Sequence, residues 1–166
     1  KINGGGSGTL TINHVTTGAD AAVITVNTNA TITALVGAYS NVINFGGGNL
    51  VVGAFPVVAN AKTVTLGGIG GGELSGGAIN ISGNPGTLKV QGSGITVANA
   101  IALPAGAIVD INETVDITGE ITVTGASTID VLTAKSLKYK FVTNDILLGA
   151  NALTLAGAGS FVSTSG

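Results

Sequence analysis

The sequence predicts an all-β chain folded as a right-handed parallel β-solenoid (β-helix) of roughly seven turns. One observation is a period-two alternation of apolar and small polar residues, as in Ile121-Thr122-Val123-Thr124, which is typical of strands. A second is that these runs are short and are separated by Gly, Asn or Ala. A third is the scarcity of aromatic residues, which make up 4% of the chain, whereas β-sandwiches use aromatic side chains to fill their cores.

The alternating runs follow one another along the whole chain, and their β-branched content favours strand over helix. No stretch has apolar residues at helical spacing beside helix-forming neighbours. The predicted strands are residues 9–13, 22–27, 30–35, 41–45, 49–53, 62–66, 72–75, 78–82, 87–91, 94–98, 100–103, 107–111, 114–118, 120–124, 128–132, 138–142, 145–149, 152–156 and 160–164.

Each turn of such a solenoid holds two or three strands and about 20 to 25 residues, and it stacks on the next turn at about 4.8 Å. Val, Ile and Leu are expected to face inward, with Thr, Asn and Ser outward. Gly119 and Gly125 are expected at corners, where a Cβ would clash or φ must be positive. Residues 16–21, 53–61 and 67–72 are irregular and are expected to bulge as loops.

Composition excludes several classes of protein. Charged residues make up 8% of the chain, the net charge is −2 and Arg is absent, so a nucleic-acid-binding face is not expected. The absence of Cys excludes disulfides and thiolate metal sites. No apolar run is long enough to predict a membrane-spanning helix. We interpret residues 1–166 as one solenoid module, a fragment or processed segment of a longer surface protein.

The carboxylates are concentrated in one region of the chain, which raises three hypotheses. They are solvated outward side chains, or they hold Ca²⁺, with Asp110 and Asp116 as candidate ligands, or two of them hydrolyse glycosidic bonds. Calcium-loop signatures are missing, and the single His14 has no triad partners. We therefore assign no catalytic residue and no resident cofactor. The five acids are Asp110, Glu113, Asp116, Glu120 and Asp130.

Other residues are candidates for contact with a partner. Lys135, Lys138 and Lys140 lie close together and either protect a strand edge from pairing or contact anionic glycans or lipids. Tyr39 and Phe55 are candidate aromatic contacts, although Phe55 also suits a place in the core. Thr-x-Thr pairs at 9–11, 31–33, 63–65 and 122–124 suggest ice binding, but their spacing is unequal.

Several stretches resemble the passenger domains of autotransporters of Gram-negative bacteria, and are most similar to rickettsial outer membrane protein A and B type surface antigens. These stretches include GTLTINHVTTGADAAVITVNTNATITALVG, NVINFGGGNLVVG, GGAINISGN and VDITGEITVTGASTIDV. The resemblance implies a secreted β-helix on the bacterial cell surface, cut from a chain with a membrane barrel at its far end. It also implies adhesion to a host-cell receptor or glycan, or a protective layer.

The function expected from the sequence is therefore an extracellular structural or adhesive surface module without enzymatic activity. The main alternative is a subunit that assembles end to end into a filament or S-layer-like lattice, because residues 1–8 are too Gly-rich to form a cap, residues 156–166 are uncharged and the net charge is near zero. Less favoured alternatives are a polysaccharide-active β-helix enzyme and an ice-binding protein.

Overall fold

The computed structural model describes residues 10–16, 22–36, 41–55, 62–81, 86–141 and 146–165. All regular secondary structure in these ranges is β-strand, as the period-two alternation predicts. Every strand pairing in this part of the chain is parallel. Parallel pairing of short strands that belong to successive turns identifies the fold as a β-solenoid.

The strands lie on three faces that recur in the same order along the chain. The first face contains β2 (Ala22–Val26), β4 (Asn41–Gly46), the start of β6 (Thr63–Gly76), β8 (Thr87–Val90), β11 (Ile108–Ile111), β14 (Ser127–Val131) and β17 (Leu153–Ala156). The second face contains β1 (Leu10–Thr16), β3 (Ala30–Val36), β5 (Leu50–Val52), the end of β6, β9 (Ile95–Val97), β12 (Val115–Ile117), β15 (Ser136–Phe141) and β18 (Ser160–Ser165). The third face contains β7 (Ile79–Asn80), β10 (Ile101–Leu103), β13 (Ile121–Val123) and β16 (Ile146–Leu147).

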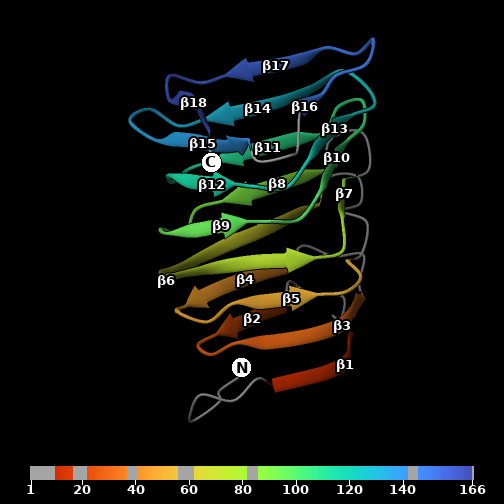
Figure 1. Ribbon diagram of the computed structural model, residues 1–166, viewed down its shortest axis with the longest axis vertical. Coiled ribbons are helices and arrows are strands. Elements are labelled where there is room, and N and C mark those ends of the chain that lie inside the picture. The colour runs from red at the N-terminus through yellow and green to blue at the C-terminus, as the bar shows by residue number, and fades with distance from the viewer. Residues whose placement is uncertain are drawn as a thin grey trace.

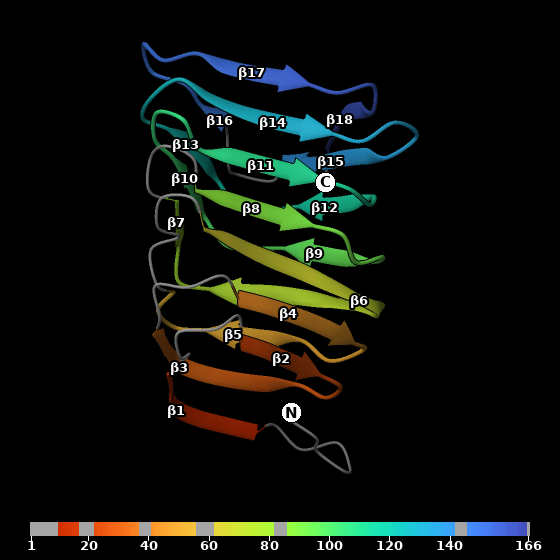
Figure 2. The ribbon, with the colours of Figure 1, turned by 180° about the vertical axis from the view of Figure 1, so that it is seen from behind.

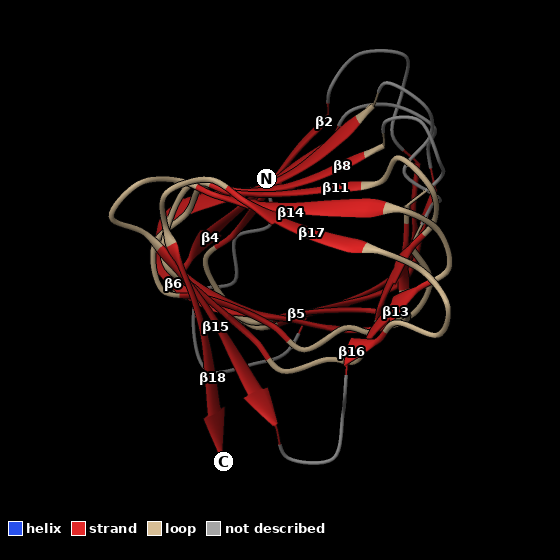
Figure 3. Cartoon of the chain, turned by 90° about the horizontal axis from the view of Figure 1, so that it is seen from above, coloured by secondary structure: helices blue, strands red, loops and turns tan. Residues whose placement is uncertain are grey.

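The strands climb in chain order from the N-terminal to the C-terminal end of the stack (Figure 1). The first face is seen directly from behind, with its strands all pointing the same way (Figure 2). Seen from above, the chain passes from the first face to the second and then the third in a counterclockwise sense as it rises toward the viewer (Figure 3). This is a right-handed coil, the sense that nearly all parallel crossover connections adopt.

Register partners in successive turns are 19 residues apart at the shortest, Val23 with Val42, and 26 at the longest, Asp130 with Ala156. This agrees with the predicted repeat of about 20 to 25 residues. The structure has about five turns, slightly fewer than the roughly seven predicted. Among the described residues, the first face has seven strands and the third face has four, from β7 onward.

The core consists of aliphatic columns, meaning residues that hold the same register position in successive strands. On the first face one buried column runs Ile24, Ile43, Leu66, Val90, Ile111 and Val131. On the third face Ile79, Ile101 and Ile121 are stacked in the same way, all buried. Each turn depends on its neighbours for burial, because a single turn cannot enclose its own apolar side chains. These inward positions were predicted by the apolar half of the alternation.

The corner positions of Gly119 and Gly125 are confirmed. Gly119 lies between β12 and β13, and a Cβ there would strike the carbonyl group of Asn99 one turn below. Gly125 lies between β13 and β14, where a Cβ would overlap the backbone of Ala105. The corners therefore require glycine because successive turns approach closely there.

The predicted loop at 67–72 is wrong, because these residues continue β6 from the first face to the second. The glycines allow it: Gly68 and Gly71 have positive φ, and the register with β4 shifts between Asn44 and Gly46. Ile69 is 96% exposed in this segment. Of the other two predicted loops, residues 17–21 and 56–61 lie outside the described residues.

Candidate binding surface on the second face

The three predicted contact lysines lie together on the second face. Lys138 and Lys140 belong to β15, and Lys135 immediately precedes it. β15 pairs with β12 on one side and with β18 on the other, so it is not an edge strand. The hypothesis that these lysines protect an edge is therefore wrong. They instead lie one turn above the acidic residues of β12 and of the corner before it.

These residues form an ionic group that we call the lysine–carboxylate cluster: Glu113, Asp116, Lys135, Lys138 and Lys140. The Nζ of Lys135 donates to both carboxylate oxygens of Glu113, at 2.7 and 2.8 Å. The Nζ of Lys140 lies 2.6 Å from Oδ2 of Asp116. Each carboxylate is thus neutralised by a lysine from the next turn.

The pKa of Glu113 is lowered from its ordinary value of 4.5, first by the hydrogen bond from Lys135 and then by the backbone N–H of Thr114. Both donors favour the ionised carboxylate. A folded-state pKa below the unfolded one means that this pair stabilises the fold at pH values above 4.5. The contribution is lost as the pH falls through the lowered pKa.

A pH-dependent stability difference follows from this pair. Glu113→Gln is expected to lower the urea midpoint of unfolding at pH 7, whereas at pH 3 the variant and the wild type should differ much less. In a Lys135→Gln background the effect of Glu113→Gln at pH 7 should shrink, because the principal partner is already gone. Equal effects of Glu113→Gln at both pH values would contradict this account of the pair.

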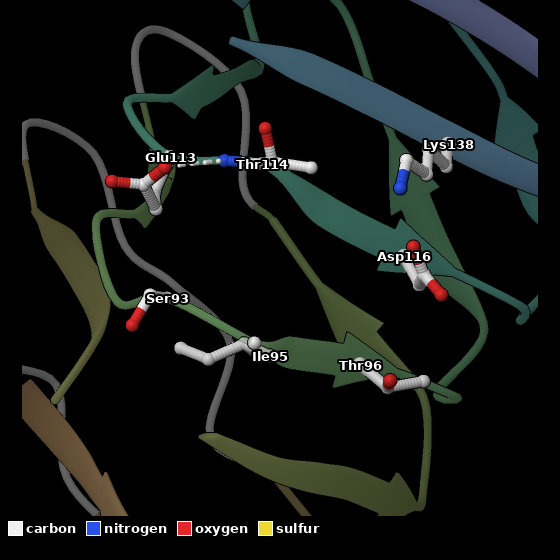
Figure 4. Close-up of a pocket in the computed structure, with 8 residues that line it drawn as sticks. Ser93, Ile95, Thr96, Glu113, Thr114, Asp116 and Lys138 are labelled. Atoms are coloured by element: carbon white, nitrogen blue, oxygen red, sulfur yellow. Dashed lines mark hydrogen bonds between the residues drawn. The ribbon is translucent and has the colours of Figure 1, made fainter. Parts of the chain in front are cut away.

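A hollow of about 250 Å³ opens beside the lysine–carboxylate cluster at the corner between the first and second faces. Figure 4 shows its lining side chains, which come from β9 and the segment that leads into it, from the corner before β12, and from β12 and β15. The lining residues are Ser93, Gly94, Ile95, Thr96, Glu113, Thr114, Asp116 and Lys138. Sequence reasoning missed Ser93, Thr96 and Thr114, since neither spacing nor motif distinguishes them from other outward hydroxyl residues.

The hollow contains polar groups that are not used elsewhere in the described part of the structure. No ion pair of Lys138 and no side-chain hydrogen bond of Ser93, Thr96 or Thr114 occurs among the described residues. The hollow therefore presents an ammonium group and three hydroxyls beside carboxylates that are already paired.

The calcium candidates Asp110 and Asp116 lie on different faces. Asp110 is on the first face, where Lys89 pairs with it at 3.3 Å and Asn112 donates to it. Asp116 is on the second face in β12. The two do not converge as a pair of metal ligands or as an acid–base pair. Among the described residues, no group of three or more His, Cys, Asp and Glu side chains is arranged to hold a metal ion.

The candidate aromatic contacts differ in position. Phe55 follows β5, is partly buried and packs against the core, so most of its ring contributes to packing. Tyr39 lies outside the described residues. Sequence reasoning missed Ile69, whose side chain is almost fully exposed in β6.

The three Thr-x-Thr pairs that lie wholly in the described residues do not form one array, and residue 9 of the pair at 9–11 lies outside them. Residues 31–33 are in β3 on the second face, residues 63–65 in β6 on the first and residues 122–124 at β13 on the third. A flat ice-binding surface needs these pairs in register on one face, and this arrangement does not supply it.

Within the described residues, the structure has no helix of the length and hydropathy that a membrane crossing requires. Comparison with protein-family models, with curated proteins and with solved structures found no match.

Proposed function

We propose that this chain is an extracellular structural and adhesive module of a bacterial surface protein, of the autotransporter passenger type. The observation that carries the proposal is the right-handed parallel solenoid with an aliphatic core throughout its described turns. Such a stack supports a mechanical role, because every turn is tied to the next by a ladder of backbone hydrogen bonds and by side-chain packing.

The chemistry of the outer surface supports a non-enzymatic role. Asp110 and Asp116 lie on separate faces, and the two carboxylates that share the hollow, Glu113 and Asp116, are each engaged by a lysine. The proposal accordingly includes no resident cofactor and no calcium requirement. It places the chain at the cell surface, where its partner is a host-cell receptor or glycan.

Adhesion is tested with the purified, fluorescently labelled chain on mammalian epithelial cells. We expect saturable binding that an excess of unlabelled chain displaces, while an unrelated protein of similar mass and net charge does not bind. The rod role is tested by limited proteolysis, in which the turns from β8 to β15 should resist cleavage. Absence of saturable binding would remove the adhesive part, and rapid cleavage within these turns would remove the structural part.

A second candidate function is end-to-end assembly into a filament or lattice. Leu155 pairs with the fully buried Ile129, so it occupies an interior column, yet it is 54% exposed on β17. Another parallel strand stacked on β17, from a further turn of the same protein or from a second copy, would cover it, and the second case is end-to-end assembly. Sedimentation velocity over a wide concentration range separates the two candidates, because assembly requires growing species and a concentration-independent monomer contradicts it.

A further inference from the structure

We propose that the hollow on the second face binds a single acidic sugar unit, a ring that carries a carboxylate and several hydroxyls. This inference rests on the proposed adhesive function and names the chemical class of its partner. It is drawn from the charges, the free hydroxyls and the size of the hollow.

Lys138 supplies the group that would recognise the carboxylate. The lysine–carboxylate cluster holds three lysines and two carboxylates, so it has one positive charge in excess. Lys135 is occupied by Glu113 and Lys140 by Asp116, which leaves the excess charge on Lys138. Its side chain is exposed, and in Figure 4 it extends into the space above Asp116. An anionic ligand would therefore complete a pattern in which each charge has a partner.

The neighbouring polar groups suit the hydroxyls of a sugar. Ser93, Thr96 and Thr114 contribute three hydroxyls, each of which can both donate and accept a hydrogen bond. Asp116 uses Oδ2 for Lys140, and its Oδ1 makes no hydrogen bond among the described residues, so it is an acceptor for a sugar hydroxyl. A simple inorganic anion would use only Lys138, whereas a sugar acid would use both kinds of group.

The size of the hollow restricts the ligand to one ring. Its volume of about 250 Å³ lies below the range of about 300–1,000 Å³ typical of pockets for drug-sized molecules. Ile95 lines it and is itself almost fully buried. The site is open to solvent at a corner of the solenoid, so the rest of a longer glycan would extend along the surface.

The test is a two-dimensional NMR titration of the ¹⁵N-labelled chain with glucuronate, and with glucose and acetate at matched ionic strength. Glucuronate is expected to shift the amide signals of residues 93–96 and 113–116 in a saturable manner, with weaker responses to glucose and acetate. Lys138→Gln should weaken glucuronate binding about tenfold, as expected for a charged hydrogen bond. Thr96→Val should weaken it without changing the response to acetate.

Lys89→Gln on the first face is the matched control and should bind glucuronate like the wild type. The proposal is overturned if glucuronate causes no saturable shifts, if acetate binds the same residues equally well, or if Lys138→Gln leaves the affinity unchanged. Thermal unfolding of each variant shows whether it is folded, and Lys138 is exposed enough for its replacement to be tolerated. If cells bind the chain but glucuronate does not, the adhesive function stands and only this assignment fails.

Discussion

Gly119→Ala is expected to destabilise the chain by about 3 kcal/mol, at the upper end of the cost of overpacking a filled site. The added methyl carbon would overlap the carbonyl oxygen of Asn99 and approach the backbone nitrogen of Ala100 to 3.0 Å. Both obstacles are backbone atoms, so rotation of a side chain cannot relieve the clash. Asn99 is also fully buried, so its backbone has no room to move outward. The turn that holds β12 and β13 would have to separate from the turn below it. The resulting loss in the free energy of unfolding is measured by urea denaturation.

Gly149→Ala provides the control for this substitution. Gly149 has φ of 55° and its nearest neighbour to an added methyl group, Nδ2 of Asn151, lies at 3.7 Å. The variant therefore has backbone strain without a clash, and its cost should be about 1 kcal/mol. Similar losses of stability in the two variants would show that the close approach of the turns at Gly119 is not what selects glycine there.

The predicted strands agree closely with the structure because the strand signal is local. Alternation with a period of two places the same residue types inward in every turn, as in the column of Ile24, Ile43 and Leu66. An apolar residue cannot be moved to the outer side without shifting the register by one, so the pattern determines strand positions and the core together. Fold class therefore followed from short windows of sequence.

The prediction was wrong at β6 because glycine removes that local signal. Residues 67–72 contain five glycines and Ile69, which leaves no alternation to read. Although most of its residues have no side chain, the segment still pairs with the strands of adjacent turns. Gly67 is the register partner of Asn44 in β4, and Gly72 is the register partner of Ile95 in β9. Its strand character comes from the stack on either side of it.

The lysine–carboxylate cluster could not be predicted because its spacing along the chain is irregular. Its partners are 22 residues apart for Lys135 and Glu113 and 24 for Lys140 and Asp116, and the separate pair of Lys89 and Asp110 on the first face is 21 apart. Corners of different lengths change the repeat from turn to turn, so sequence intervals do not identify which charges meet. The hollow depends on the same corner geometry.

Tyr139→Ala is expected to cost about 3–5 kcal/mol, the range for removing a large buried ring. Tyr139 is fully buried in β15, lies in the column above Ile117, and stacks on Phe161 of β18 with ring centroids 6.5 Å apart. The cavity would lie between the turn of β15 and that of β18. Tyr139→Phe keeps the ring and should cost only about 1 kcal/mol, the contribution of the hydroxyl group.

Where the stability is lost distinguishes a solenoid from a globular core. Turns contact only their neighbours, so the loss in Tyr139→Ala should be local. Amide hydrogen exchange should accelerate in β12, β15, β17 and β18, while β4, β6 and β8, two to four turns away, keep their protection. Uniform acceleration along the stack would mean that the turns unfold as one unit. Local loss would mean that each turn is stabilised by the two it contacts, which is how a rod can lengthen without a larger core.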